Sequence, residues 1–433
     1  TVYQHLITEY ESQAPGAQVI AQYTPGKEDY GRKITTSFSG NTAPDVFLIN
    51  YREYGQYAAS GALEPLGPRL RESPVISESD FYELPLDAFR GADGELVCIP
   101  QNISSLVVYY NVELFAAAGL DLPTADWTLD DFVEAAQALT LDVDNDGISD
   151  VHGLVTDSSM VRYAPFIWMH GGEIVDNIEH PTRLLLDSPE ARQGIEWFMD
   201  LGAGGHKVVP TEAETLAEDN LSRFMNGRAA MMLDSRRVVP TLREIDAFVW
   251  DVAALPRGEE RASVLHSDAF CMSAEVADKE AAWRFIEYAV GLQGQEILAA
   301  TGRTVPSLRS VAESTVFYGD PDRPGAVGET VNTASPASAH VFLDTIPTLR
   351  RLPSFATWPE VEDIFNAEFQ KSLYDDFDIE KALENVNSNA HDAIRRATDD
   401  DSSKSVVDPL WAWHEGTPQR SVGPKERQSR SGY

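Results

Sequence analysis

The chain has 433 residues, and its 69 acidic against 34 basic side chains give a formal net charge of −35. This charge argues against a nucleic-acid-binding surface, because it would repel phosphates. The hydrophobic fraction of 43% is typical of a globular protein with a real core, and no apolar run approaches the roughly 18 residues that a membrane span needs. The length is enough for two or three domains.

The first fifty residues alternate between helix and strand patterns. We predict a helix over residues 1–14, a strand over 15–24, a helix over 29–40 and a strand over 44–50. This alternation predicts a parallel sheet with helices on its faces. Because no strand precedes the first helix and the chain starts at a residue other than Met, we expect that an N-terminal segment is missing and that it carried a targeting signal.

Further elements follow along the chain. Residues 95–111 form the longest β-rich run, and the helix after it should end at Gly119. Thr128 and the acid three residues later resemble a capping box at the start of another helix. Ser188 and the proline after it start a further helix, and residues 278–290 have the apolar stripe of an amphipathic one.

Motifs for catalysis are missing from the sequence. It contains no phosphate-binding loop, no zinc-protease pair of histidines, no nucleophile elbow and no Cys-x-x-Cys. The nine histidines are scattered singly, and the carboxylates are too numerous for any pair to indicate a glycosidase. These features favour a protein that is not an enzyme.

Residues 142–150, "DVDNDGISD", carry the one sharp motif. Aspartates at alternate positions, with Gly147 allowing a sharp turn, match the start of an EF-hand calcium loop. The expected ligands are the carboxylates of Asp142, Asp144, Asp146 and Asp150 and the backbone carbonyl of Ile148. The twelfth position is Gly153 instead of a bidentate Glu. We therefore expect a weak structural Ca²⁺ site, with an Asp-rich solvated turn as the alternative.

The two cysteines, Cys98 and Cys271, both lie in apolar strand-like runs. Free cysteine is among the most buried residue types, so we expect two buried thiols, with a single disulfide as the alternative.

Six segments in order and with suitable gaps resemble the extracellular solute-binding proteins, family 1, the substrate-capturing components of ABC importers. They include "GNTAPDVFLINYREYGQYAASGALEPL", "FIWMHGGEIVD", "FMNGRAAMMLDSRRVVP" and "DKEAAWRFIEYAVGLQGQEILAATGRTVPS", and the similarity runs from about residue 1 to 398. The family's first strand and its ligand loop would precede Thr1.

This resemblance implies an α/β fold of the type II periplasmic-binding-protein class. Two lobes, each a mostly parallel sheet flanked by helices, would be joined by hinge strands. Lobe 1 would comprise residues 1–100 and 270–311, and lobe 2 residues 101–269 and 312–398, with a tail over 399–433 that is disordered at its end. The two cysteines would then lie on neighbouring hinge strands, which favours the disulfide more than the sequence alone does.

The resemblance also implies a ligand-binding cleft between the lobes. The strand "DVFLIN" delivers polar and aromatic side chains to its carboxyl end, where open α/β sheets bind ligands. The residues expected to contact solute are Asn50, Tyr51, Arg52, Ser104, Ser105, Arg162, Tyr163, Trp168, Asp234, Ser235, Arg236, His266, Ser267, Asp268 and Trp358. Core packing is the alternative for Trp168 and Trp358, and capping of the sheet without contact to solute is the alternative for Tyr51. Pairing with an acid is the alternative for Arg236 or Arg237.

The function implied is non-catalytic capture of a sugar or polyol by hinge closure, for transfer to the membrane permease subunits of an ABC importer. We expect a monomer that is periplasmic or extracellular, lipid-anchored through the missing N-terminal segment, and without nucleic-acid partners or a cofactor other than Ca²⁺. The alternatives are an anionic glycerophosphate-type solute, held by Arg52, Arg162 and Arg236, and a secreted glycan-active enzyme.

Overall fold

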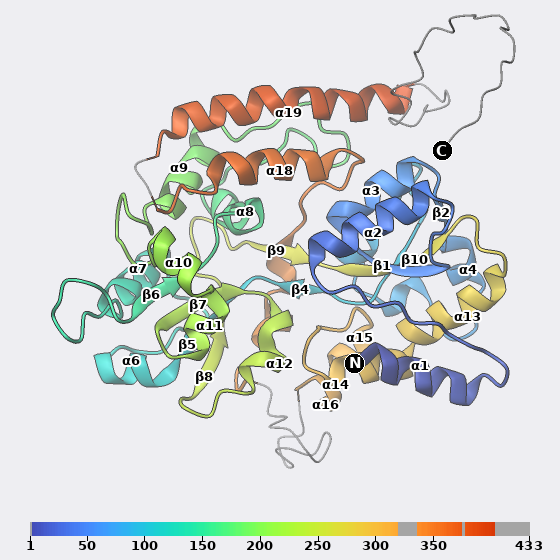
Figure 1. Ribbon diagram of the computed structural model, residues 1–433, viewed down its shortest axis with the longest axis horizontal. Coiled ribbons are helices and arrows are strands. Elements are labelled where there is room, and N and C mark those ends of the chain that lie inside the picture. Colours follow the sequence, from blue (N-terminus) through green and yellow to red (C-terminus); the bar gives the residue numbers. More distant parts are fainter. Residues whose placement is uncertain (1, 319–335, 375–376, 403–433) are drawn as a thin grey trace, which may run out of the picture.

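The chain folds into two lobes, each built on its own four-stranded sheet (Figure 1). The structure is a computed structural model, and it describes residues 2–318, 336–374 and 377–402. A small three-stranded sheet lies between the lobes. The predicted two-lobed architecture is confirmed. None of the helices within these ranges has the length and apolar content that a membrane span requires.

The sheet of lobe 1 is organised around one central strand, β10. The strands are β1 (Val46–Asn50), β2 (Leu63–Glu64), β3 (Ile99–Pro100) and β10 (Asp268–Ser273). β10 pairs antiparallel with the other three, and Leu48 of β1 lies opposite its Phe270. The helices of this lobe are α1 (Val2–Gln13), α2 (Lys27–Ser39), α3 (Tyr51–Ala59), α4 (Gly67–Glu72), α5 (Glu83–Asp87), α13 (Lys279–Val290), α14 (Leu292–Ala300), α15 (Arg309–Ala312) and α16 (Thr315–Tyr318), with the 3₁₀ turn η1 (Glu78–Asp80).

The sheet of lobe 2 has the strand order β6-β7-β5-β8. Its strands are β5 (Val107–Asn111), β6 (His152–Val155), β7 (Ala229–Asp234) and β8 (Trp250–Ala253). The elements around it are α6 (Val112–Ala118), α7 (Leu129–Ala138), α8 (Met160–Met169), α9 (Pro189–Met199), α10 (Glu212–Ala217), α11 (Asn220–Met225), η2 (Arg236–Val238), α12 (Val239–Leu242), α17 (Val341–Asp344) and η3 (Ile346–Thr348). β5 and β7 are buried along their whole length, as expected for a sheet covered on both faces.

The hinge sheet joins the lobes. It contains β4 (Ser104–Ser105), β9 (Ser263–His266) and β11 (Leu349–Arg350). β3 leads into β4, and β9 leads back into β10, so both crossings run through this sheet. Two long helices, α18 (Trp358–Phe369) and α19 (Ile379–Ser402), pack together along one edge of the molecule, where α18 also contacts α8 and α3 (Figure 1).

The end signals predicted from sequence act as expected. The Thr128 side chain accepts from the backbone of Asp131 while the Asp131 carboxylate accepts from the Thr128 backbone, which completes the capping box of α7. Gly119 ends α6 in the left-handed conformation, with φ of 69°, which a residue with a side chain would adopt only with strain. The Ser188 side chain caps α9.

Three expectations about the fold are wrong in part. Except for the pairs β6–β7 and β9–β11, the described strand pairs are antiparallel, because strands that return through the hinge enter each sheet in the opposite direction. Residues 15–24 form no strand: Pro15 and Gly16 lie in a turn, and no neighbouring strand pairs with the residues after them. Helix α19 continues to Ser402, so the predicted tail begins as helix, and the rest of it lies outside the described residues.

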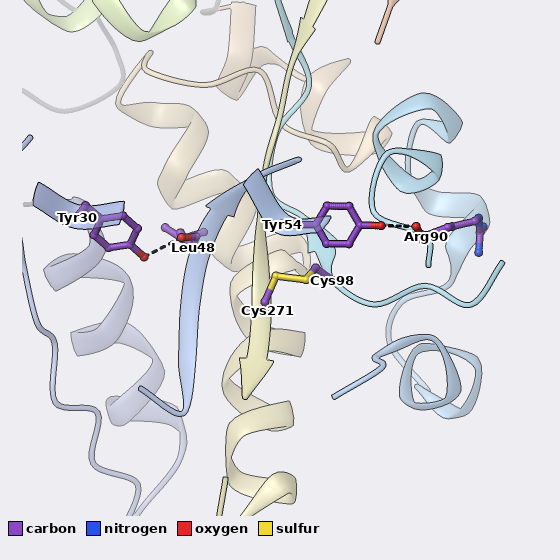
Figure 2. The surroundings of a disulfide bond; sticks show 6 residues. All are labelled: Tyr30, Leu48, Tyr54, Arg90, Cys98 and Cys271. Atoms are coloured by element: carbon purple, nitrogen blue, oxygen red, sulfur yellow. Dashed lines mark hydrogen bonds between the residues drawn. A yellow bond between two sulfur atoms is a disulfide. The ribbon is translucent and has the colours of Figure 1, made fainter. Parts of the chain in front are cut away.

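Cys98 and Cys271 form a disulfide, so the expectation of two free thiols is wrong (Figure 2). Phe270 lies opposite Ile99 in the β10–β3 pair, and this register places the two cysteines directly across from each other, with Cα atoms 4.6 Å apart. Both are fully buried. In the chain-entropy model, a bond that closes a loop with a sequence separation of 173 stabilises the fold by roughly 5 kcal/mol.

Candidate functional site

The floor of the site is one face of the hinge sheet. Ser104 lies opposite His266 and Ser105 opposite Leu265 in the β4–β9 pair, and residues directly opposite each other share a face. Ser105 Oγ accepts a hydrogen bond from Thr345 Oγ1 at 3.1 Å, so its face is packed within lobe 2. On the other face, Ser104 Oγ and His266 Nδ1 are buried and have no hydrogen-bond partner among the described residues. Two unsatisfied polar atoms on one face are what a site for a polar ligand would provide.

The wall from lobe 1 forms where β1 ends and α3 begins. The Asn50 side chain caps α3 by accepting from the Arg52 backbone N–H at 3.2 Å, and it donates to Asp268 Oδ1 at 3.1 Å. The Arg52 guanidinium donates from Nε to Asn50 Oδ1 at 3.2 Å and from Nη1 to Glu362 Oε2 at 2.5 Å. A cap residue therefore ties the first turn of α3 to the hinge strand β10.

The wall from lobe 2 forms at the end of β7 and the start of α8. Asp234, the last residue of β7, accepts from Arg237 Nε at 3.0 Å and Nη2 at 3.2 Å, and its Oδ1 lies 3.7 Å from Arg162 Nη2. Arg162 also lies with its Nε 3.1 Å from Asp157 Oδ2. Burial raises the pKa of Asp234, but Arg162 and Arg237 outweigh it, so the pKa is lowered overall.

His266 lies where the two walls meet. Burial, followed by the charges of Arg162 and Arg52, lowers its pKa to about 3. These arginines belong to different lobes, so both lobes approach the imidazole closely enough to act on it. The ring is therefore neutral at physiological pH, with one nitrogen that donates and one that accepts. Burial also raises the pKa of the neighbouring Asp268.

The aromatic residues predicted for the site lie in packed surroundings. Tyr51 and Trp358 have no exposed area, and the Tyr51 hydroxyl accepts from the Leu352 backbone N–H at 3.1 Å. Tyr163 is also fully buried, with its hydroxyl 2.6 Å from Ser372 Oγ. Trp168 is 2% exposed, beneath the Arg350 guanidinium carbon, which lies 4.9 Å from the ring centroid. In this arrangement of the lobes, Tyr51, Tyr163 and Trp358 offer no face to a solute, whereas Trp168 lines a pocket together with Arg350.

Three polar residues predicted for the site act within the scaffold. Ser267 Oγ donates to the Asn102 carbonyl at 2.7 Å, which ties the two crossing segments together. The Ser235 carbonyl accepts from the Tyr109 hydroxyl at 2.9 Å. Arg236 is fully buried, with its guanidinium carbon 4.1 Å and 4.6 Å from two phenylalanine ring centroids. Successive side chains of the 3₁₀ turn η2 point in different directions, so Arg237, and not Arg236, reaches Asp234.

Sequence reasoning missed Arg237, Asp157 and Glu362 as parts of this site. Glu362 accepts from Trp358 Nε1 at 2.6 Å as well as from Arg52. It lies four residues after Trp358 on α18, so the two side chains share one helix face. The sequence signal that could have identified Glu362 is its position four residues after Trp358, which was a predicted ligand residue.

The predicted calcium loop lies on the surface of lobe 2, between α7 and β6. One carboxylate oxygen from each of Asp142, Asp144 and Asp146 lies within 4.8 Å of the others, a spacing that a cation with 2.3–2.6 Å bonds to oxygen can bridge. The Asp150 carboxylate accepts from the Val143 backbone N–H at 2.7 Å, and Ile148 is exposed. The donor set suits a hard cation such as Ca²⁺.

The fold is that of a two-lobed protein with a small hinge sheet between its lobes. Residues 5–325 match the model of the bacterial extracellular solute-binding protein family, and the chain belongs to this family. The family description places the protein in the periplasm or outside the cell.

The sequence identities to individual relatives are low. The chain is 26% identical over 376 residues to the erythritol/L-threitol-binding protein of Mycolicibacterium smegmatis, covering 80% of this chain and 72% of that one. An ABC substrate-binding protein of Listeria monocytogenes in complex with cycloalternan superposes with a TM-score of 0.75 at 24% identity, over 92% of this chain and 94% of that one. UgpB of Mycobacterium tuberculosis in complex with glycerophosphocholine superposes with a TM-score of 0.77 at 18% identity, over 91% and 95% of the two chains.

We predict that replacing His266 changes how stability depends on pH. The folded-state pKa of about 3 lies below the ordinary value of 6.5, so between these values the unfolded chain binds more protons. The stability contributed by the neutral ring is present above pH 6.5 and is lost as pH falls towards 3. At pH 5 the loss amounts to about 1–2 kcal/mol, which His266→Gln should avoid.

Urea unfolding of both proteins from pH 7 to pH 4.5 measures this difference. His5→Gln, at an exposed position of α1, serves as the control and should follow the wild type. Parallel pH profiles for the wild type and His266→Gln would contradict the buried, neutral state of this ring.

Proposed function

We propose that the protein captures a sugar or polyol between its lobes and delivers it, chemically unchanged, to the permease subunits of an ABC importer. The observation that carries this proposal is the pair of buried, unpartnered atoms, Ser104 Oγ and His266 Nδ1, on the hinge face where both lobes meet. A hydroxyl and a neutral imidazole each offer a donor and an acceptor, and hydroxyl groups of a solute need both. The erythritol- and cycloalternan-binding relatives support this class of solute.

The charges of the cleft also favour a neutral solute. Arg52 is paired with Glu362, and both Arg162 and Arg237 are paired with Asp234. Each arginine therefore meets a carboxylate already, which reduces its attraction for an anionic solute. An anionic glycerophosphate-type solute, suggested by the three arginines and by the UgpB neighbour, would have to displace these carboxylates.

The pairing of Glu362 and Asp234 with arginines supports binding without catalysis. Glu362 accepts from both Arg52 and the Trp358 indole, and the Asp234 carboxylate has its pKa lowered. Asp234 is therefore not placed as a protonated general acid for glycoside cleavage. We expect incubated oligosaccharides to remain intact.

Location and assembly complete the proposal. A disulfide persists in an oxidising compartment, and the Cys98–Cys271 bond supports a periplasmic or extracellular place of action. We propose that the protein acts as a monomer beside its permease, attached to the membrane by an N-terminal lipid.

The solute class can be tested by a thermal-shift screen of tetritols, monosaccharides, maltooligosaccharides and glycerophosphocholine. A solute present at 100 times its Kd should stabilise the fold by about 2.7 kcal/mol and raise the Tm by several degrees. We expect a hit among the polyols or sugars. A response to glycerophosphocholine alone would favour the anionic alternative, and products of hydrolysis would favour an enzyme.

Two neighbouring serines provide matched variants for this screen. Ser104→Ala should weaken binding of the identified solute by about 5–10-fold, the effect of one lost hydrogen bond of about 1 kcal/mol. Ser105→Ala changes the same side chain on the packed face and should leave affinity unchanged. Equal effects of the two variants by isothermal titration calorimetry would show that the solute does not use this face.

We also propose that loop 142–150 binds Ca²⁺ as a structural ion. The clustering of the Asp142, Asp144 and Asp146 carboxylates supports this, because their mutual repulsion is relieved by a cation. The loop lacks the bidentate Glu at position twelve, so we expect a Kd in the range of about 10⁻⁴ to 10⁻³ M.

Calorimetry in excess EDTA and then in several millimolar calcium tests this site. Binding to the folded state alone should raise the Tm, and Asp144→Ala should abolish the rise. Asp121→Ala, an exposed acid outside the loop, should keep it. Identical melting of the wild type in both conditions would leave an acidic turn without an ion.

A further inference from the structure

A continuous chain of hydrogen bonds runs from the hinge to the C-terminal helices. Asn50 donates to Asp268 and accepts from Arg52, and Arg52 donates to Glu362. Glu362 in turn accepts from the Trp358 indole. The chain begins on β10 and ends in the first turns of α18. It connects the solute-facing end of α3 to a helix that also packs on lobe 2.

The Arg52–Glu362 ion pair is the link that crosses between the lobes. Arg52 starts α3 of lobe 1, whereas Glu362 lies on α18, which packs against α19, against α8 of lobe 2 and against α3 itself. Its two side chains are only 10% and 9% exposed. Burial lowers the pKa of Arg52, but the Glu362 charge outweighs this and raises it overall, so Arg52 stays charged.

Backbone contacts next to the ion pair show how closely α3 meets the segment before α18. A Cβ added at Gly55 would lie 1.9 Å from the Ser354 carbonyl oxygen, so only glycine fits there. The Tyr51 hydroxyl accepts from the Leu352 backbone N–H in the same interface. The ion pair lies beside this interface, so it separates if the interface opens.

We propose that Glu362 is a positioning residue of the cleft, which holds the Arg52 guanidinium in place when the lobes are closed and so couples closure to solute binding. The effect of Glu362 on solute binding rests on the proposed function. Its effect on closure of the lobes can be measured in the solute-free protein. Glu362 acts through Arg52 and Trp358.

The energetics of a buried ion pair predict different effects for single and double variants of Arg52 and Glu362. Taking two charges out of water offsets most of their attraction, so the intact pair does not by itself hold the lobes shut. Removing one partner leaves the other charge buried and uncompensated in the closed arrangement, whereas replacing both by apolar groups of similar length removes the penalty. Single variants should therefore disfavour closure, and the double variant should restore it.

The test is a double-mutant cycle of Arg52→Met, Glu362→Met and both together. Fluorescence energy transfer between dyes at Val75→Cys in lobe 1 and Leu216→Cys in lobe 2, both exposed positions, reports the closed population without solute. We expect each single variant to lower the ratio of closed to open molecules at least tenfold and the double variant to recover most of it. The control is Glu360→Met, which lies on the same helix as Glu362, breaks the exposed pair with Arg396 of α19 and should change nothing.

Glu362→Gln provides a second variant, in case a methionine variant fails to fold. It keeps an acceptor for the Trp358 indole and removes only the charge, so it should also favour the open state. If every variant that folds shows the wild-type transfer efficiency while the single variants melt at lower temperature, the pair is only structural and the proposal is overturned. Failure of the solute screen would instead count against the proposed function and leave this result unaffected.

Discussion

The pairing of β3 with β10, closed by the Cys98–Cys271 disulfide, determines where the chain passes between its lobes. Just beyond the disulfide, Asn102 binds the opposite crossing segment twice, through its carbonyl to Ser267 Oγ and through its side chain to the Asp268 backbone N–H. The Ser307 hydroxyl donates to the Pro100 carbonyl from a third segment. Buried backbone groups at the crossing are thereby satisfied, which a buried connection requires.

The site follows from this constraint. Because β4 and β9 pair in one register, Ser104 and His266 share the face on which the lobes meet, and Ser105 faces away. Arg52 approaches from lobe 1 and Arg162 from lobe 2, each at the start of a helix and each beside a carboxylate. The site therefore exists only where both lobes contribute, which is a suitable arrangement for sensing whether a solute is present.

Features that depend on a few neighbouring residues, such as helix ends, could be predicted from the sequence. Helix ends at Thr128, Ser188 and Gly119 have their own capping chemistry, and Asn50 at the polar end of β1 caps the helix that follows. The resemblance to solute-binding proteins supplied the two-lobed architecture, which periodicity alone did not.

What depends on distant partners was not predictable. Strand direction in each sheet depends on the direction in which the chain re-enters that lobe from the hinge. The alternation of helices and strands in the sequence does not indicate this direction. The choice between Arg236 and Arg237 depends on the direction of one 3₁₀ turn, and the burial of Trp358 depends on Glu362 and Arg52, which is 310 residues away from Glu362 in the sequence. The disulfide needed the register of β3 against β10.

Closure of the lobes over a bound solute is the central claim, and small-angle X-ray scattering measures it most directly. The profile of the full chain should be recorded without solute and at saturation with the sugar or polyol that binds. A ligand that contacts both lobes favours the closed arrangement by its differential affinity, so the radius of gyration should decrease. An unchanged radius of gyration at a saturating concentration, verified by calorimetry on the same sample, would contradict capture by hinge closure.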